Sequence, residues 1–286
     1  MFAPRTALPK LTDRLQLGTS GLEVSPFCLG LVNDPEIVVA AFEAGINFFF
    51  VTADMHWPLY EGTRLGLKKL LTDKPEARDS VVIGVVSYVQ QPEFCWAPFM
   101  EVLEAFPSFK RIDVSICGGS YGDEIARRLG IYAQHRKAGF MGIKSTGATF
   151  HDRSAILPTF DAGTVDIGFV RYNPNHPGAA SEVFPKIRED HPLLFNFKSA
   201  DGWASSEQLA KVGIADDFWH PHQTDYYRFA LSQPALDGIL CALPHVQAVR
   251  DLEDALAKGP LDEEDQQYLR DIAELLAGKA KVAEAS

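Results

Sequence analysis

Short apolar runs rich in Val, Ile and Phe alternate with segments of helical length along all 286 residues of the chain. Most of these runs are continuously apolar, which is typical of parallel strands buried on both faces of a sheet. Eight such runs separated by helices predict the α/β class and a closed (β/α)₈ TIM barrel, a fold that uses about 250 residues as one unit. The predicted strands are 26–31, 47–51, 81–88, 111–117, 139–145, 165–172, 193–197 and 236–242.

Two further elements flank this alternation. Residues 14–25, RLQLGTSGLEVS, predict a β-hairpin with a glycine-containing turn before the first barrel strand. In residues 261–276, an apolar stripe that includes Leu269, Ile272 and Leu276 has helical spacing and predicts a helix packed outside the barrel. Because no linker or shift of composition divides the chain, residues 1–286 are expected to form a single domain.

The composition narrows the classes of partner. Twenty-seven Lys and Arg against 38 Asp and Glu leave a net charge of −11, which argues against binding of nucleic acid or an anionic membrane surface. No apolar run reaches the roughly 18 residues needed to cross a bilayer. The first residues lack an apolar signal core, so a cytoplasmic location is expected. The expected partner is a small molecule, and the sequence does not settle the oligomeric state.

Cysteine and histidine spacing does not favour a metal site. None of the four cysteines forms a CxxC pair, and His220 and His222 lack a third ligand close by in sequence, so no metal is expected. The cysteines are expected to be small buried side chains. They are Cys28, Cys95, Cys117 and Cys241.

Four segments carry a resemblance to a known family. In chain order they read LGTSGLEVSPFCLGL, AFEAGINFFFVTAD, VDIGFVRYNPNHPGAASEVFP and YYRFALSQPALDGILCALPHVQAVRDLEDALAKGPLDEED. They resemble the aldo-keto reductase superfamily over nearly the whole chain. The resemblance implies a (β/α)₈ barrel with a hairpin across its bottom and NADPH-dependent reduction of carbonyl groups. It also implies an Asp, a Tyr, a Lys and a His at the upper ends of strands two, three and four.

The chain departs from the family at all four of those positions. Val51 stands in the place of the aspartate, His56 of the tyrosine, Val86 of the lysine and Gly118 of the histidine. Losing one partner of a buried ion pair is costly, whereas replacing both by apolar groups can be neutral. The interpretation is that the ion pair was lost as a unit, and Val51 and Val86 are then expected to pack together at the top of the barrel.

The cofactor positions of the family are also altered. By the resemblance, Ser145 after strand five and Arg250 after strand eight are the remaining cofactor-binding candidates, while Phe169 stands where the family has a glutamine. The sequence therefore predicts no cofactor with its usual contacts. It leaves weak NADPH binding open.

The catalytic candidates are His56, Asp54 and Arg171, because function in this fold lies at the carboxyl ends of the strands. Histidine exchanges protons near neutral pH, and Asp54 is close enough to orient His56. The alternatives are an exposed loop histidine and an aspartate that only stabilises its turn. Alternation from Phe169 places Arg171 inside the barrel, where it binds either an anionic ligand or a barrel acid. The substrate-binding candidates are Trp57, Tyr60, Tyr88, Lys144, Tyr172, Asn173 and Lys198.

Three functions remain open. The leading hypothesis is an enzyme that acts on a small anionic metabolite by non-reductive acid–base chemistry, meaning elimination, isomerisation, cyclisation or condensation. The second is a catalytically inert binding or regulatory protein, and the retained polar groups argue against it. The third is an NADPH-dependent carbonyl oxidoreductase in which His56 replaces the tyrosine, and the altered cofactor positions argue against that.

Overall fold

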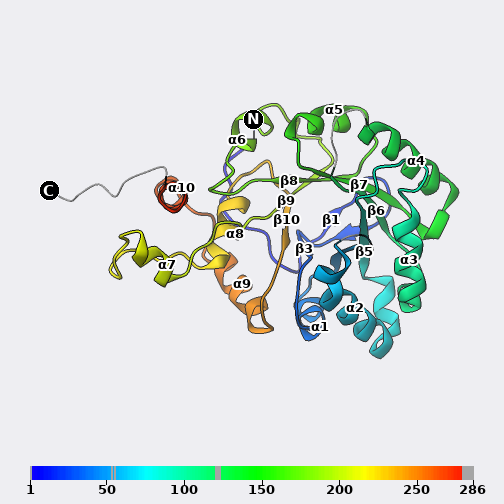
Figure 1. Cartoon of the computed structure of the whole chain (residues 1–286), viewed down its shortest axis with the longest axis horizontal. Coiled ribbons are helices and arrows are strands. Elements are labelled where there is room, and N and C mark those ends of the chain that lie inside the picture. The colour runs from blue at the N-terminus through cyan, green and yellow to red at the C-terminus, as the bar shows by residue number, and fades with distance from the viewer. Residues whose placement is uncertain (1, 53, 55, 120–123, 279–286) are drawn as a thin grey trace.

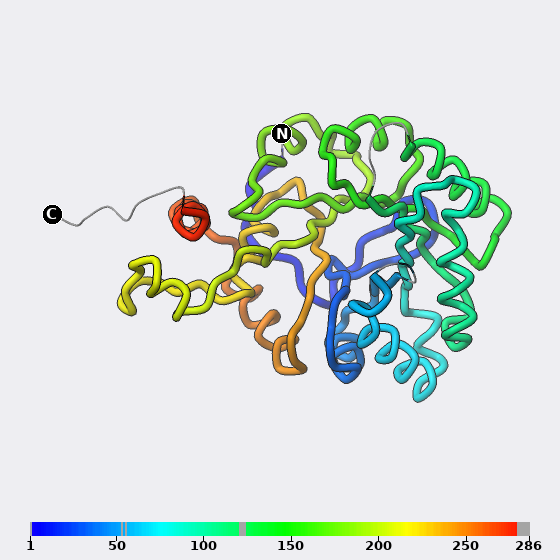
Figure 2. Tube along the Cα trace, in the orientation of Figure 1, coloured from blue at the N-terminus to red at the C-terminus, as the bar shows by residue number. Residues whose placement is uncertain are grey.

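The computed structural model describes residues 2–52, 54, 56–119 and 124–278. In these residues eight parallel strands close into a barrel, as the sequence predicts (Figures 1 and 2). The strands follow one another around the ring in chain order, and the last pairs with the first. They are β3 (Phe27–Leu29), β4 (Phe48–Thr52), β5 (Val82–Ser87), β6 (Val114–Cys117), β7 (Ser145–Phe150), β8 (Ile167–Arg171), β9 (Leu193–Phe197) and β10 (Gly238–Cys241).

Helices surround this ring, and most of them connect one strand to the next (Figure 1). The α-helices are α1 (Glu36–Glu43), α2 (Glu61–Asp73), α3 (Ala97–Ala105), α4 (Glu124–Ala138), α5 (Ile156–Asp161), α6 (Ala179–Glu182), α7 (Ser206–Lys211), α8 (Gln223–Leu231), α9 (Gln247–Ala257) and α10 (Glu263–Leu276). The 3₁₀ helices are η1 (Trp57–Tyr60), η2 (Pro75–Asp79), η3 (Pro107–Phe109), η4 (Phe140–Gly142) and η5 (Arg153–Ala155).

The two flanking elements lie where the sequence predicts them. The antiparallel hairpin of β1 (Leu15–Gln16) and β2 (Glu23–Val24) packs Leu17 and Val24 into the inner core of the barrel, so it closes the amino-terminal end. Helix α10 lies outside the ring (Figure 1). Its residue Ile272 packs in a small outer cluster that also contains Leu209 of α7.

The core has two layers, because successive side chains of a strand point to opposite faces. Phe48 and Phe50 of β4 belong to the cluster inside the barrel, whereas Phe49 and Val51 belong to the cluster between strands and helices. The inner layer holds aromatic rings in edge-to-face contact, among them Phe50 and Phe169 with centroids 5.5 Å apart. These rings fill the barrel, so a ligand has room only above them.

The amino-terminal end is held by a hydrogen bond that recurs on alternate strands. Just before every second strand stands a residue whose side-chain oxygen accepts a hydrogen bond. The donor is a main-chain N–H near the start of the preceding strand. Such bonds satisfy donors that would otherwise be buried without a partner, and they set the register of adjacent strands. The acceptors are Asn47, Asp113, Asp166 and Asp237.

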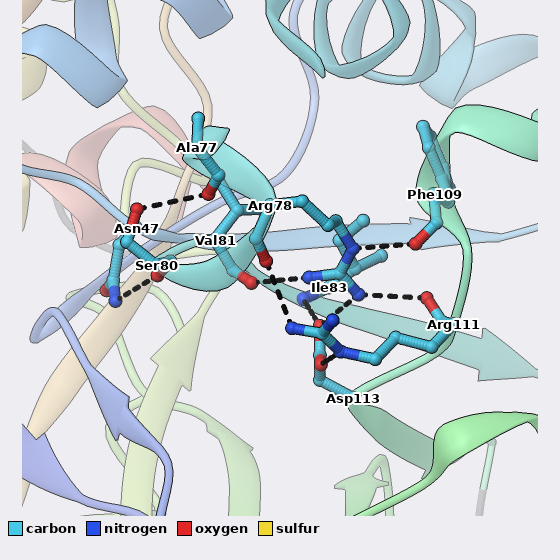
Figure 3. A network of polar contacts seen from close by, with 9 residues as sticks. All are labelled: Asn47, Ala77, Arg78, Ser80, Val81, Ile83, Phe109, Arg111 and Asp113. Atoms are coloured by element: carbon cyan, nitrogen blue, oxygen red, sulfur yellow. Dashed lines mark hydrogen bonds and ion pairs between the residues drawn. The ribbon is translucent and has the colours of Figure 1, made fainter. Parts of the chain in front are cut away.

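Asp113 forms the most extensive of these contacts (Figure 3). Its Oδ2 accepts from Ile83 N at 2.8 Å and from Arg78 Nη2 at 2.7 Å, and its Oδ1 accepts from Arg111 Nε at 2.8 Å. The Arg78 guanidinium also donates to main-chain carbonyls, including that of Phe109 at 2.6 Å. Both Asp113 and Arg78 are buried, so each charge depends on the other.

The predicted range of the fifth barrel strand, 139–145, is wrong, because the strand begins later in the chain. Strand β7 starts at Ser145, and the preceding residues form η4, where Met141 and Gly142 have φ values of 52° and 79°. A backbone with positive φ cannot continue a strand. The apolar composition of this turn produced the error, because the true strand carries Gly147 and Thr149 on its inner face.

Candidate active site at the carboxyl ends of the strands

A cavity of about 840 Å³ opens at the carboxyl ends of the barrel strands. Its base includes Phe50 and Phe197 of the inner core, and loops after most of the strands form its walls. The lining residues are Gly30, Leu31, Phe50, His56, Leu59, Tyr60, Tyr88, Gln90, Gly119, Thr149, His151, Phe197, Lys198, Ser199, Ala200, Asp201, Gln223, Tyr227, Leu240, Cys241 and Ala242.

One carboxylate joins the loops that carry the two ring side chains on one wall. Asp54 Oδ2 accepts from the main-chain N–H of Tyr88 at 2.5 Å, and its Oδ1 accepts from the main-chain N–H of His56 at 3.2 Å. The His56 Nδ1 atom lies 3.5 Å from Asp54 Oδ1. The ring centroids of His56 and Tyr88 are 4.5 Å apart. Asp54 therefore holds His56 and Tyr88 in contact at the edge of the cavity.

Tyr88 occupies the space beside Gly118. A Cβ atom added to Gly118 would lie 2.7 Å from both Tyr88 Cδ1 and Val86 Cγ2, closer than real side chains approach. Only glycine therefore allows the Tyr88 ring to take this position. Burial and the nearby Asp54 charge raise the pKa of Tyr88 to about 12, so its hydroxyl stays protonated at neutral pH.

Basic side chains lie on the opposite wall. His151 follows β7, and its ring lies 5.4 Å from that of Phe197 at the end of β9. Partial burial lowers the pKa of His151, and the charges of Lys198, Arg171 and His56 lower it further. Arg171 is half-buried on the inner face of β8, and no hydrogen bond or ion pair of its guanidinium occurs in the described part of the chain. His151 and Lys198 line the cavity together with Asp201, whereas Arg171 is not among the lining residues. Lys198 is therefore the cation that an anionic ligand in the cavity would meet.

Polar groups outside the cavity hold these strand ends in place. Arg64 on α2 donates from Nη1 to the Thr52 carbonyl at 3.1 Å, and Arg128 on α4 donates to the carbonyls of Gly118 and Ser87 at 2.9 and 2.7 Å. Both guanidinium groups are fully buried. They fix the carboxyl ends of β4, β5 and β6, from which the loops with the site residues start.

The structure separates the predicted substrate-binding residues into two groups. Tyr60, Tyr88 and Lys198 line the cavity. Trp57 and Tyr172 do not: Trp57 lies under the Arg64 guanidinium, whose central carbon is 3.3 Å from its ring centroid, and Tyr172 belongs to the outer layer. For these two, a contact with a ligand in the cavity is not supported, because their rings pack away from it.

Asn173 has a supporting position. It is fully buried, and its Nδ2 donates to the main-chain carbonyl of Lys198 at 2.8 Å. Lys198 has a φ of 56°, a conformation that costs energy in a residue with a side chain. The Asn173 bond helps to hold that conformation, so Asn173 positions Lys198 instead of contacting a ligand.

Lys144 and Ser145 lie at the wrong end of the barrel for their predicted roles. Strand β7 starts at Ser145, whose hydroxyl donates to Asp166 Oδ2 at 2.8 Å at the amino-terminal end. Lys144 precedes the strand and is exposed there. The placement of both residues at the end of strand five is therefore wrong, because the strand begins where it was predicted to finish.

Val51 and Val86 do not form the apolar pair that the sequence predicts. Val51 is opposite Val85 in the β4–β5 register, and Thr52 is opposite Val86. Val51 belongs to the outer core layer and Val86 to the inner one. The two side chains point to opposite faces of the sheet, so the prediction that they pack together is wrong.

The corrected strand brings in residues that the sequence analysis missed. Thr149 near the end of β7 and His151 just after it line the cavity, together with Gln90, Gln223 and Tyr227. A strand beginning at Ser145 would have placed His151 at its carboxyl end from the sequence alone. The helical residues Gln223 and Tyr227 had no such signal, since nothing in their pattern distinguishes the pocket side of α8.

The residues present do not fit a nicotinamide dinucleotide bound in the way the family resemblance implies. Ser145 lies at the far end of the barrel, and Arg250 is exposed on α9. Phe169, in the place of the family's glutamine, packs its ring against Phe50 and Phe195 inside the barrel. The three positions therefore do not form one binding surface.

A metal site is likewise not supported at the two closely spaced histidines. His220 Nε2 lies 3.1 Å from the carbonyl of Ala215, and His222 Nδ1 accepts from Thr224 N at the start of α8. Among the residues that the structure describes, no group of three or more His, Cys, Asp or Glu side chains could hold a metal ion. No helix in the described ranges is long and apolar enough to cross a bilayer.

Fold and site together define a (β/α)₈ barrel protein with a cavity at the carboxyl ends of its strands.

No protein-family model and no curated protein matches the sequence. Among solved structures, the holo form of an aldo-keto reductase from Bacillus halodurans is similar with a TM-score of 0.68 and 16% identity, over 96% of this chain and 99% of that one. A thermostable aldo-keto reductase in complex with the inhibitor epalrestat has a TM-score of 0.67 and 15% identity, over 91% and 99%. An aldo-keto reductase from a Medee basin deep-sea metagenome has a TM-score of 0.65 and 14% identity, over 91% and 94%.

The chain has the aldo-keto reductase fold, as its sequence segments predicted. With sequence identities of 14–16% to these structures, the chain is a divergent member of that fold.

Proposed function

We propose that the chain is an enzyme that acts on a small anionic molecule by non-reductive acid–base chemistry, with His56 as the group that transfers the proton. The observation that carries this proposal is the contact of Asp54 with both His56 and Tyr88 at the edge of the cavity. A cytoplasmic location remains part of the proposal.

The geometry suggests how the proton would move. Because His56 Nδ1 faces Asp54, Nε2 is the nitrogen left to exchange a proton with a bound ligand. Tyr88 keeps its proton and would donate a hydrogen bond to a ligand oxygen. In an isomerisation, His56 removes a proton from one ligand atom and returns it to another, so the step needs no oxidant or reductant.

The opposite wall supports an anionic ligand. Lys198 and Arg171 lie near His151, and the net charge of −11 for the whole chain makes this local concentration of positive groups unusual. A carboxylate or phosphate placed there would be bound by charge-assisted hydrogen bonds. It would also hold the reactive part of the ligand across the cavity from His56.

Thermal-shift measurements test the anion site. Small carboxylates and phosphates are expected to raise the melting temperature of the native protein, because a ligand that binds only the folded state stabilises it. The shift should disappear in Lys198→Met and persist in Lys144→Met, which removes an exposed lysine at the other end of the barrel. If no anion stabilises the native protein, or if both variants respond equally, the proposed site is wrong.

Proton exchange tests the chemistry. Ligands that stabilise the protein are incubated with it in D₂O, and loss of C–H signals is followed by NMR. We expect exchange without any added cofactor, and its loss in His56→Gln while ligand binding is kept. Binding without exchange in the native protein would instead support the inert binding protein.

The fold neighbours favour one alternative, because all three described above are aldo-keto reductases. In that alternative the chain is an NADPH-dependent carbonyl oxidoreductase with His56 in place of the tyrosine. Titration of tryptophan fluorescence with NADPH separates the two: we expect weak or no binding. Saturable quenching at low micromolar NADPH would favour the reductase.

A further inference from the structure

A second cavity of about 630 Å³ adjoins the first one. The two have four lining residues in common, so they lie next to each other at the barrel mouth. The shared residues are Leu31, Leu59, Gln223 and Ala242. The outer cavity, which we call the leucine groove, is lined by Leu31, Val32, Asn33, Pro35, Pro58, Leu59, Glu61, Gly62, Leu65, Gln223, Ala242, Leu243 and Pro244.

Three leucine side chains of the leucine groove are exposed to solvent. The exposed fractions of Leu31, Leu59 and Leu65 are 39%, 57% and 39%. Glu61 is the ionisable residue among those that line it. Neighbouring leucines exposed along one groove mark a place where an apolar group binds.

The leucine groove and His151 lie on opposite sides of the barrel mouth. In the closed ring, β3 is opposite β7 and β4 is opposite β8. Leu31 and Leu59 follow β3 and β4, whereas His151 follows β7. Lys198 follows β9, which is two strands from β3 around the ring. Figure 1 shows the same separation, with α1 and α2 on one side of the ring and α5 and α6 on the other.

His56 and Tyr88 lie beside the apolar side of this span. Both line the first cavity, and they follow β4 and β5. A ligand that extends across the mouth from His151 to the leucine groove would run beside these two rings. Its reacting atoms would then lie between its two ends.

We propose that the substrate is amphipathic: an anionic head binds at His151 and Lys198, and an apolar tail binds in the leucine groove. This inference rests on the proposed function for the anionic head and adds the tail. It assigns the ligand to organic acids or phosphate esters that carry an extended hydrocarbon part. Small polar metabolites that fill only the first cavity would leave the groove unused.

Two homologous series of probes test the proposal by calorimetry. The first is n-alkyl carboxylates and the second is n-alkyl phosphates, each from about four to about ten carbons and below its micelle concentration. Burial of each added methylene is expected to tighten binding about threefold to fourfold. The series with the higher affinity at equal chain length identifies the head group.

A variant and its control separate tail binding from surface effects. Leu65 lines the leucine groove and not the first cavity, so Leu65→Ser should flatten the dependence on chain length and leave the affinity of the shortest anion unchanged. Met100→Ser removes a side chain with the same exposed fraction, 39%, that lines neither cavity. It should leave the dependence on chain length as in the native protein.

The outcomes distinguish the two proposals. If short anions bind and affinity does not rise with chain length, the proposed function stands and the amphipathic substrate is wrong. If affinity rises equally in Leu65→Ser, the tail binds elsewhere and the leucine groove is not its site. If no anion of any length binds, both proposals fail.

Discussion

The Asp54 side chain accepts the main-chain N–H of Tyr88 with a distance of 2.5 Å between Oδ2 and N. This bond joins the loops that follow β4 and β5, and the other oxygen of the same carboxylate faces His56. The aspartate therefore links the position of one site residue to that of the next. Its removal should change both the stability and the geometry of the site.

Asp54→Ala should destabilise the protein by about 1–3 kcal/mol, because partly buried main-chain donors lose their acceptor. Asp54→Asn should lose less, since its remaining oxygen still accepts one N–H. Urea unfolding measures both. Asp201→Ala, an exposed aspartate on the same cavity, is the control and should change stability by less than about 0.5 kcal/mol. Equal losses for Asp54→Ala and Asp201→Ala would show that the Tyr88 contact contributes nothing.

Stability should fall as the pH drops below the ordinary histidine range. Burial lowers the pKa of His135, His151 and His176, and in His151 the charges of Lys198 and Arg171 add to it. With the folded pKa below the unfolded value of about 6.5, the unfolded chain takes up protons first, so the stability is complete above that pH and decreases below it.

The pH dependence is measured from urea midpoints between about pH 7.5 and about pH 5.5, a range chosen to limit titration of carboxylates. His151→Gln should reduce the slope, because it removes one of the three groups. A slope unchanged in that variant would mean that His151 has the same pKa in both states.

Asp113→Asn should cost about 3–5 kcal/mol, because it leaves the buried Arg78 without its counter-ion. The matched control is Asp190→Asn, which breaks an ion pair of similar length, 2.6 Å, between Asp190 and Arg188 on the surface. That change should cost less than about 1 kcal/mol. Chemical denaturation measures both, and similar costs would contradict a stabilising role for the buried pair.

Gly118→Ala should destabilise the protein by about 1–3 kcal/mol, because the new methyl group would overlap the Tyr88 ring and Val86. It should also weaken ligand binding in the cavity, since Tyr88 must move. Gly130→Ala on α4 meets no atom within 4 Å and should be neutral or stabilising. Thermal unfolding and ligand titration of both variants test this, and an unperturbed Gly118→Ala would show that Tyr88 has room to shift.

The sequence alone determined the barrel class, the closing hairpin and the outer C-terminal helix. These features follow from local patterns: apolar runs of strand length, a glycine turn and a helical stripe that includes Leu269 and Ile272. It also placed His56 at the mouth of the barrel, where the residue lines the cavity, because the segment around it stands directly after a strand. Each of these predictions needed only neighbours in the chain.

The tertiary structure decided what depends on register and on which face a side chain takes. A shift of the predicted range 139–145 to Ser145–Phe150 moves Lys144 away from the cavity and brings His151 into it. Val51 and Val86 point to opposite faces of the sheet, because Val51 is paired with Val85 and not with Val86. The closed ring also places His151, after β7, across the mouth from Leu31, after β3, because closure brings strands that are far apart in sequence to opposite sides of one ring. No local sequence pattern encodes that arrangement.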